Sequence, residues 1–261
     1  MTKYIFFDID GTIWDEYMNI PQSTKETIVK LKENGHKTFL CSGRSRSNIR
    51  SKELLDLGFD GIIAACGNYI EMDGKVLYDN LLPQDFIRKA IALLEEEHMP
   101  VVLEGPVNHW VDADTFVDDP YVDYLIQEMG RHALPIKGYE GSFEIEKFSA
   151  DITSQTNFDR VKEELAPVMD CLVHEGNVVE FVPTGTSKAT GIQKLMDLMN
   201  IQKDDLYAIG DSVNDLDMLQ FVPHSIAMGN ATQIAKDSAE FITTNIHSDG
   251  IKNAMSHYGL I

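Results

Sequence analysis

The segment that decides the fold is Tyr4-Ile5-Phe6-Phe7-Asp8-Ile9-Asp10-Gly11-Thr12, near the start of the 261-residue chain. Its first four residues form an apolar run without alternation, which is typical of a strand buried on both faces of a parallel sheet. Two carboxylates follow, two residues apart, and can lie on the same side if the strand continues. Gly11 then permits the chain to leave the strand sharply. The segment predicts a central strand with a polar site at its carboxyl end, although Asp-Gly alone is also ordinary turn chemistry.

The same rhythm of apolar run and helical stretch recurs in both outer thirds of the chain. Strands that alternate with helices predict parallel pairing. We expect strands at 38–41, 62–65, 206–209, 225–227 and 241–242, and a hairpin turn at Asp73-Gly74. A first helix is expected to begin at Ser23 with a capping box and to end at Gly35. Further helices are expected over 45–57, over 188–199, from about Asn214, and over 233–238. The predicted fold class is α/β, with a doubly wound, Rossmann-like parallel sheet formed by residues 1–82 and 184–261.

The middle of the chain differs in both charge and pattern. Residues 83–183 carry 7 basic and 21 acidic side chains, a net charge of −14 out of −20 for the whole chain. Paired strands between helices predict an α+β unit on an antiparallel sheet. We expect helices at 84–97, 120–129 and 158–168, and strands at 101–104, 109–113, 144–148, 171–174 and 178–182. Pro83 and Pro183 suit extended linkers, so we predict an inserted domain over residues 83–183.

Composition argues against several classes of protein. A net charge of −20 opposes binding along a nucleic-acid backbone, which requires clustered Lys and Arg. No apolar run reaches the roughly 20 residues that span a bilayer, and the acid at position 8 comes too early for a signal peptide. Three cysteines, Cys41, Cys66 and Cys171, are too scattered for a disulfide framework or a zinc site. We expect a soluble, cytoplasmic protein without nucleic-acid or membrane partners.

Polar groups follow two further predicted strands. Ser42-Gly43-Arg44 comes after one strand and opens a helix, where backbone N–H groups and the serine hydroxyl favour an anion. Asp211 stands just past another strand, as Asp8 does, and Asp215 lies one helical turn further on. Two acids at this spacing suit a hard cation that takes oxygen ligands. Each motif taken alone also fits an ordinary helix cap or a solvated acid.

The joint occurrence of these groups makes the case for a site. Lys188 opens a predicted helix just before the last acidic motif, and it provides the cation that a cluster of acids needs. Acidic and hydroxyl groups that follow three buried strands are expected to meet at the carboxyl edge of the sheet. Because crowded carboxylates repel each other, a bound Mg²⁺ is the natural way to keep them ionised.

Four ordered motifs therefore stand out along the chain: Asp8-Ile9-Asp10-Gly11-Thr12, Ser42-Gly43-Arg44, Lys188, and Gly210-Asp211-Ser212-Val213-Asn214-Asp215. Together they resemble the motifs of the haloacid dehalogenase superfamily. The insertion between the second and third motifs resembles the α/β cap of its Cof-type (type IIB) phosphatases. The runs 227–231 and 249–251 are also similar to that subfamily, so that the resemblance spans essentially the whole chain.

The resemblance implies a phosphohydrolase that works through an aspartyl-phosphate. Asp8 would be the nucleophile, and Asp10 would protonate the leaving oxygen and then activate water. Mg²⁺ would be held by Asp8, the Asp10 carbonyl and Asp211, while Asp215 would hold metal-bound water or orient Lys188. The phosphate- and substrate-binding residues that the resemblance implies are Ser42, Gly43, Arg44, Lys188 and Asn214.

The predicted cap would close over the phosphate and select the leaving group. Its net charge of −14 opposes the binding of additional phosphates. We therefore expect small phosphomonoesters as substrates, sugar phosphates first, with pyridoxal phosphate or flavin mononucleotide after them. Two alternatives stay open, a phosphomutase on the same core and a non-enzymatic phospho-aspartate signalling switch. We expect a monomer or a homodimer.

Some features lie outside these roles. After the third strand the family commonly has Asn-Gly-Ala, whereas this chain has Cys66-Gly67-Asn68, and no role is carried over to Cys66. Trp14, just after the first motif, either lines the entrance of the site or anchors the flap. His109 and Trp110 are expected to pack within the cap rather than to meet substrate.

Overall fold

The computed structural model describes residues 1–116 and 119–261. The described chain divides into two compact units, each of which has its own sheet. The first unit consists of residues 1–43, 50–78 and 187–261, and the second of residues 44–49 and 79–186. The segment predicted as an inserted domain, 83–183, lies within the second unit.

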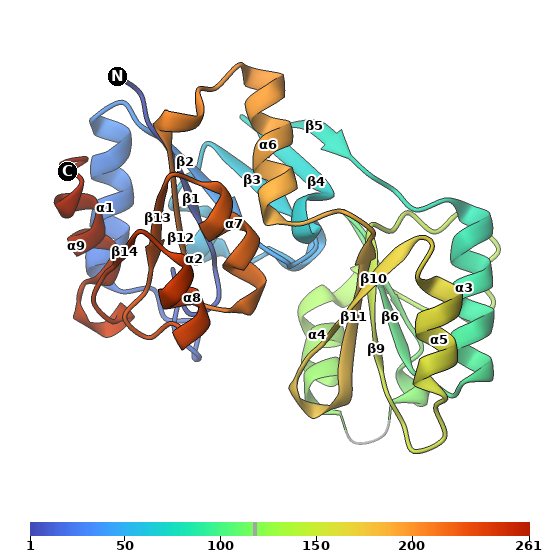
Figure 1. Cartoon of the computed structure of the whole chain (residues 1–261). Coiled ribbons are helices and arrows are strands. Elements are labelled where there is room, and N and C mark those ends of the chain that lie inside the picture. The colour runs from blue at the N-terminus through green and yellow to red at the C-terminus, as the bar shows by residue number, and fades with distance from the viewer. Residues whose placement is uncertain (117–118) are drawn as a thin grey trace. The chain divides into compact units, whose positions relative to one another are not determined.

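The first unit is built on an eight-stranded sheet in the order β14-β13-β12-β1-β2-β3-β4-β5 (Figure 1). Its strands are β1 (Tyr4–Phe7), β2 (Lys37–Cys41), β3 (Gly61–Ala64), β4 (Tyr69–Met72), β5 (Lys75–Asp79), β12 (Leu206–Gly210), β13 (His224–Ala227) and β14 (Phe241–Ile242). The strands from β14 to β3 pair in parallel, and β4 returns antiparallel to β3. The strand order runs outward from β1 in both directions, which confirms the predicted doubly wound α/β fold.

Helices connect the parallel strands of this unit. They are α1 (Gln22–Glu33), α2 (Lys52–Leu55), α6 (Lys188–Met199), α7 (Leu216–Phe221), α8 (Gln233–Ser238) and α9 (Gly250–His257). α1 packs beside α9, and α6 beside α7 (Figure 1). The predicted helix over 188–199 is confirmed at both ends.

Three predicted helices of this unit are wrong in detail. The first begins at Gln22 without a side-chain cap, and Ser23 lies inside it, where its carbonyl accepts a hydrogen bond from Thr27 Oγ1 at 2.7 Å. The segment 45–57 is a 3₁₀ turn at 46–48 followed by the single turn α2, because Ser45 and Ser47 bond elsewhere, as described below. The helix expected from Asn214 starts as a 3₁₀ turn and becomes α-helical only at α7.

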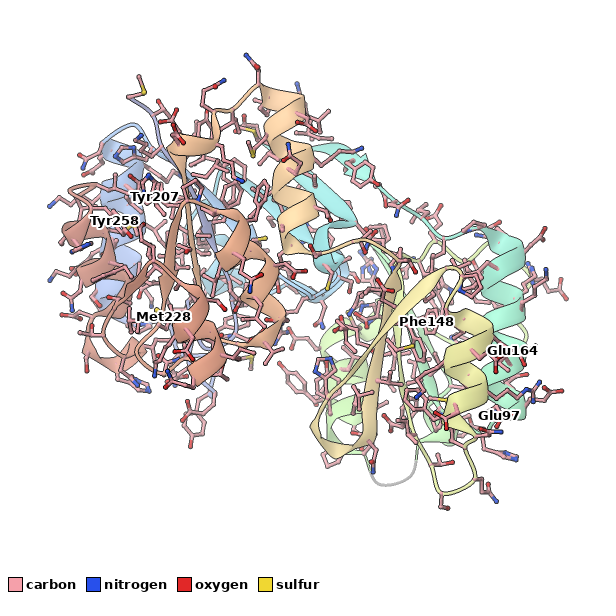
Figure 2. The ribbon with its side chains drawn as sticks, viewed as in Figure 1. Glu97, Phe148, Glu164, Tyr207, Met228 and Tyr258 are labelled. Atoms are coloured by element: carbon pink, nitrogen blue, oxygen red, sulfur yellow. The ribbon has the colours of Figure 1, made fainter. Side chains whose placement is uncertain are left out.

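Aromatic and aliphatic side chains of neighbouring strands form the core of the first unit. Phe6 of β1 stacks on Phe39 of β2 with their ring centroids 5.2 Å apart, and both are fully buried. Ile192 and Leu195 of α6 pack into the same cluster. Every residue of β12 is buried, as expected for a strand covered on both faces. At the edge of the core, Tyr207 meets Tyr258 edge to face at 5.2 Å (Figure 2).

The second unit has a six-stranded sheet in the order β10-β11-β9-β6-β7-β8. Its elements are α3 (Gln84–Glu96), β6 (Val101–Glu104), β7 (His109–Val111), α4 (Pro120–Met129), β8 (Ala133–Leu134), β9 (Lys147–Asp151), α5 (Phe158–Leu165), β10 (Met169–Val173) and β11 (Val178–Pro183). Pairing is antiparallel as predicted, except that β8, which we did not predict, runs parallel to β7. The strand predicted at 144–148 begins only at Lys147.

No helix among the described residues is long and apolar enough to cross a membrane.

The two faces of this sheet carry different side chains, because residues alternate along each strand. One face presents Leu103, Phe148 and Phe181, which are neighbours in register, and Phe148 is labelled in Figure 2. The phenyl rings of Phe148 and Phe181 stack with their centroids 4.8 Å apart. This face belongs to the apolar core that includes residues of α3 and α5. On the other face, Val102 and Val111 pack against α4.

Two serines join residues 44–49 to the strands of the second unit. The Ser45 hydroxyl lies 2.8 Å from His109 Nε2, and both residues are buried. The Ser47 hydroxyl donates to the Gly105 carbonyl at 2.6 Å. His109 therefore anchors a loop within this unit, which agrees with its expected packing role.

Candidate active site

Three predicted site residues follow three adjacent strands of the first unit. Asp8 follows β1, Ser42 follows β2, and Asp211 follows β12. β1 pairs in parallel with both neighbours, so their carboxyl ends lie at one edge of the sheet. The Asp8 amide continues the ladder by donating to the Ile209 carbonyl at 2.9 Å. The sheet thus brings an acid, a hydroxyl and a second acid to the same edge.

Lys188 occupies the first position of α6 and reaches into this group of acids. The helix begins with a capping box, in which the Ser187 side chain and the Thr190 side chain bond each other's backbone. The Lys188 side chain is 1% exposed, and its Nζ lies 2.6 Å from Asp8 Oδ1 and 2.6 Å from Asp215 Oδ1. One buried ammonium therefore joins two buried carboxylates.

Burial and charge shift the pKa values of this group strongly. Burial, with Asp215 nearby, raises the pKa of Asp8 well above its ordinary value, although Lys188 opposes the shift. Burial alone would lower the pKa of Lys188, but Asp215 and Asp8 outweigh it, so that the lysine stays charged. Burial, with Asp215 beside it, raises the pKa of Asp211 to about 7. The single positive charge of Lys188 therefore does not compensate the burial and mutual repulsion of these carboxylates.

The oxygen atoms of Asp8, Asp211 and Asp215 suit a divalent cation. One carboxylate oxygen from each lies within 4.8 Å of the other two. Three ionised carboxylates and one ammonium have a net charge of −2, which a divalent cation balances. Asp211 Oδ1 is buried and has no hydrogen-bond partner among the described residues, as expected of an oxygen that awaits a ligand. An all-oxygen donor set fits Mg²⁺.

Asp215 is also a structural residue of the same turn. Its Oδ2 accepts hydrogen bonds from the Asp211 amide at 2.9 Å and the Ser212 amide at 3.1 Å. Its Oδ1 is the one that meets Lys188. Asp215 is fully buried. Its carboxylate is held by two backbone amides through one oxygen and by Lys188 through the other.

Asp10 is placed differently from the other acids of the motifs. Its side chain is exposed, and it does not belong to the three-carboxylate group. Its Oδ1 accepts a hydrogen bond from the indole nitrogen of Trp14 at 2.9 Å. Gly11 then turns away with a φ of +76°, and a Cβ there would lie 2.3 Å from Asp211 Oδ2. Only glycine lets the turn pass so close to Asp211.

The predicted phosphate-binding residues are divided between the units. Ser42 and Gly43 end the first segment of the first unit, and Ser42 is buried, whereas Arg44 belongs to the second unit. Asn214 is exposed, and its Oδ1 accepts from the Ser212 hydroxyl at 2.7 Å and lies 3.5 Å from Lys188 Nζ. The first unit alone thus gathers Ser42, Lys188 and Asn214 near the acids' strand ends.

The trio Cys66-Gly67-Asn68 forms an unusual turn after β3. Ala65 and Cys66 have φ values of +49° and +53°, and Gly67 has a φ of +89°. A Cβ on Gly67 would lie 2.3 Å from the Ser187 carbonyl, just before Lys188. The backbone of the trio therefore packs closely against the start of α6.

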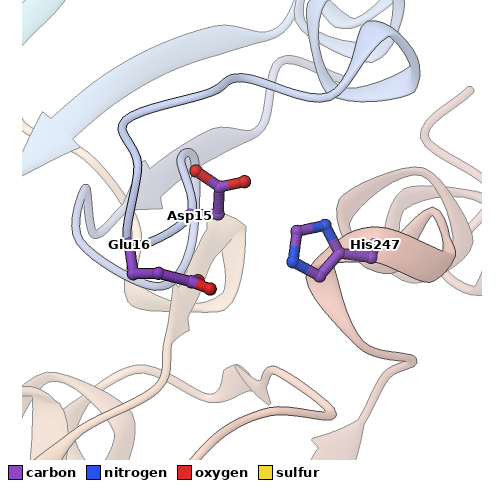
Figure 3. Close-up of side chains that lie close together, drawn as sticks. All are labelled: Asp15, Glu16 and His247. Atoms are coloured by element: carbon purple, nitrogen blue, oxygen red, sulfur yellow. The ribbon is translucent and has the colours of Figure 1, made fainter.

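A second cluster of side chains that could bind a metal lies in the first unit and consists of Asp15, Glu16 and His247 (Figure 3). The Asp15 carboxylate already accepts from the amides of Tyr17 and Asn19, both at 2.9 Å. Those bonds lower its pKa, the Asn19 amide most. Glu16 and His247 are exposed, so the cluster is a hydrogen-bonded turn with solvated neighbours.

Two residues hold the first motif in ways that the sequence did not predict, although Trp14 was named there as an entrance or flap residue. One is Trp14, through its bond to Asp10. The other is Asn230, whose Nδ2 donates to the Gly11 carbonyl at 2.7 Å and whose Oδ1 accepts from the Ile246 amide at 3.0 Å. The run 227–231 pointed to this loop but not to its contact with Gly11, which depends on the path of the chain.

Comparison with known proteins agrees with this geometry. A model of the haloacid dehalogenase-like hydrolase family matches residues 5–255. YkrA of Bacillus subtilis (strain 168), a phosphatase by name, is 33% identical over 264 residues, which are 100% of this chain and 99% of YkrA. The 5-amino-6-(5-phospho-D-ribitylamino)uracil phosphatase YwtE of the same organism is 27% identical, with 95% of each chain covered. Two further relatives are longer, and this chain spans 46% and 54% of them.

Solved structures of haloacid dehalogenase phosphatases also resemble this chain. A sugar phosphatase of haloacid dehalogenase subclass IIB is 26% identical, with a TM-score of 0.82, and the match covers 99% of this chain and 100% of that one. The sheet, the acids at its carboxyl edge and the matched relatives agree on one assignment. The chain belongs to the haloacid dehalogenase-like hydrolases, as an enzyme of the Cof-type (subclass IIB) phosphatases.

Proposed function

We propose that the protein is a Mg²⁺-dependent phosphatase of small phosphomonoesters, sugar phosphates first, which works through an aspartyl-phosphate on Asp8. The observation that carries the proposal is the ammonium of Lys188, 2.6 Å from both Asp8 and Asp215. A buried cation against a carboxylate at a strand end suits a nucleophile that must stay ionised beside a phosphate.

In the first half of the reaction an oxygen of Asp8 attacks phosphorus, and the bond between phosphorus and the leaving oxygen breaks. Asp10, entering as the acid, gives its proton to the leaving oxygen. Ser42, the Gly43 amide, Asn214 and Lys188 are the proposed partners of the phosphoryl oxygens, and Arg44 is a further candidate for substrate. Such charge neutralisation and positioning supply most of the catalysis of phosphoryl transfer.

In the second half water attacks the same phosphorus and the bond to Asp8 breaks. Asp10 takes the proton of that water, which returns it to its starting acid form. Asp8 leaves as a carboxylate beside Lys188, and inorganic phosphate departs. Covalent catalysis thus divides one displacement into two easier ones.

Mg²⁺ would be held by Asp8, Asp211 and the backbone carbonyl of Asp10, with Asp215 behind them. When bound, it would neutralise carboxylate and phosphoryl charge. The three acids, when ionised, and Lys188 have a net charge of −2, and this charge and the unpartnered Asp211 Oδ1 support the binding of the cation at this place.

The substrate class rests on charge and on the relatives. The net charge of −14 over residues 83–183 opposes a second phosphate group. Among the relatives are a sugar phosphatase and a phosphatase of a phosphorylated ribityl compound. Pyridoxal phosphate and flavin mononucleotide, also monophosphates, come next.

Phosphate release from a panel of small esters, with and without Mg²⁺, tests the proposal. We expect Mg²⁺-dependent turnover that Asp8→Asn abolishes and that Asp217→Asn, an exposed acid on the same unit, leaves unchanged. A preference for nucleoside triphosphates or bisphosphates would contradict the substrate class.

Two other outcomes would point to the alternatives. A protein that releases no phosphate but keeps a stable aspartyl-phosphate after acetyl phosphate treatment would be a signalling switch. Transfer of labelled phosphate to a second hydroxyl of the substrate, in preference to water, would indicate a phosphomutase.

A further inference from the structure

We propose that Trp14 is a positioning residue for Asp10, which its indole N–H holds in place for proton transfer. The inference rests on the proposed role of Asp10 as the acid and base. It assigns to Trp14 a task beyond those expected from the sequence, which were to line the entrance or to anchor the flap.

Asp10 needs such a partner because its side chain is exposed. An exposed aspartate samples several rotamers, while general acid catalysis requires the carboxyl group within hydrogen-bond reach of the leaving oxygen. The indole nitrogen of Trp14 lies 2.9 Å from Asp10 Oδ1 and can only donate. The bond from the indole therefore restrains the rotamer of the carboxyl group.

Trp14 is itself held firmly, as a positioning residue must be. It is only 3% exposed, and its neighbour Ile13 is fully buried. Its carbonyl accepts from the Gly11 amide at 3.0 Å, and its own amide donates to the Ile9 carbonyl at 3.2 Å. These bonds close a tight turn around Asp10, which forms an isolated bridge with Trp14.

Asn230 secures the same turn from another loop. Its side-chain amide donates to the Gly11 carbonyl at 2.7 Å, while its oxygen accepts from the Ile246 amide at 3.0 Å. The amide and the carbonyl of Gly11 are therefore both hydrogen-bonded. The rigid part of the motif is its backbone with Trp14, and Asp10 is the side chain that this frame orients.

The chemistry gives this role a specific signature. Proton donation matters most when the leaving oxygen is strongly basic, as in sugar and alkyl phosphates, and least for p-nitrophenyl phosphate, whose leaving group is stable as an anion. A misplaced acid should therefore slow the first half of the reaction, up to departure of the leaving oxygen, selectively for alkyl esters. A general loss of packing or of phosphate binding would slow all esters alike.

The kinetic test compares Trp14→Phe with the wild type on p-nitrophenyl phosphate and on a sugar phosphate. We expect kcat/KM for the sugar phosphate, which covers only the steps up to departure of the leaving oxygen, to fall by roughly 10–100-fold, and kcat/KM for the p-nitrophenyl ester to fall by less than about threefold. Asp10→Asn should show the same selectivity, more strongly. Trp110→Phe, at the other tryptophan of the chain and buried in the second unit's core, is the matched control and should show no selectivity.

Each contrary result has a distinct meaning. Equal losses of kcat/KM on both esters, or a Trp14→Phe enzyme with a kcat/KM for the sugar phosphate as high as that of the wild type or higher, would overturn the inference while leaving the phosphatase intact. Loss of selectivity in Asp10→Asn would instead overturn the role proposed for Asp10. No turnover of any ester by the wild type would contradict the proposed function.

A second measurement needs no activity at all. Two tryptophans give two indole N–H signals in a ¹⁵N-labelled protein, and the two Phe variants assign them. We expect Asp10→Ala to shift the Trp14 signal and to leave that of Trp110 in place. An unmoved Trp14 signal would overturn the inference even in a chain that releases no phosphate.

Discussion

The ammonium nitrogen of Lys188 lies 2.6 Å from Oδ1 of Asp8, although 180 residues separate the two in sequence. The lysine lies at the start of α6 and the aspartate directly after β1, so only the folded first unit brings them together. Both are almost fully buried. Their contact couples the integrity of the fold to the charge of the proposed nucleophile.

Lys188→Met should therefore weaken both fold and activity. It leaves the buried carboxylates of Asp8 and Asp215 without a cation, which typically costs about 3–5 kcal/mol. Urea unfolding without Mg²⁺ measures the loss, and phosphate release measures the activity. Lys194→Met, at an exposed site on the same helix, should change neither, and equal stability of the two variants would contradict the expectation.

Gly11→Ala should remove activity beyond what its backbone strain explains. The new Cβ would lie 2.3 Å from Asp211 Oδ2 and displace that carboxylate. Gly35→Ala is the matched control, since Gly35 has a similar φ of +82° and open space around it. Both variants should lose about 1–2 kcal/mol of stability, but only Gly11→Ala should lose phosphate release, by about 100-fold or more. Similar activities in the two variants would show that Asp211 tolerates displacement.

Glu146→Gln should stabilise the protein at alkaline pH. Burial, with Asp79 nearby, raises the pKa of Glu146 to about 9 from an ordinary 4.5. The native state keeps a proton that the unfolded chain has lost, so the wild type loses stability as pH rises from about 4.5 to about 9. The variant should match the wild type near pH 4.5 and exceed it by about 1–4 kcal/mol at pH 8, in urea unfolding. Exposed Glu144→Gln should show no such divergence.

Glu180→Gln should have the opposite pH dependence. Burial opposes ionisation of Glu180, but Lys147 and His174 outweigh it and lower the pKa to about 2. The stability that this carboxylate contributes is present above its ordinary 4.5 and is lost as pH falls toward 2. The variant should be less stable at pH 7 by about 1–3 kcal/mol and should approach the wild type near pH 2. A constant difference across this range, measured against exposed Glu163→Gln, would contradict the assignment.

Strands were predictable here because buried parallel strands leave a plain signal. Tyr4–Phe7 and Leu206–Gly210 are apolar without alternation, and the structure has them within a residue of the expected ends. The helix expected over 45–57 failed because Ser45 and Ser47 bond His109 and the Gly105 carbonyl, partners far away in sequence. Periodicity within a segment carries no information about such partners.

The candidate site also contains residues that could be predicted from the sequence and contacts that could not. Asp8, Asp211 and Lys188 could be placed from the sequence, because strand ends and a helix start fix where their side chains emerge. The bond from Trp14 to Asp10 and the bond from Asn230 to Gly11 could not, since each depends on a rotamer or on the path of a loop.

The short segment 44–49 has a consequence for engineering this enzyme. It follows Ser42 and Gly43 directly in the chain, yet it forms part of the second unit, bound through Ser45 to the strand that begins at His109. A chimaera made by transplanting residues 79–186 from a relative would leave this segment facing unfamiliar strands. A graft of residues 79–186 that is to keep these contacts must therefore carry residues 44–49 as well.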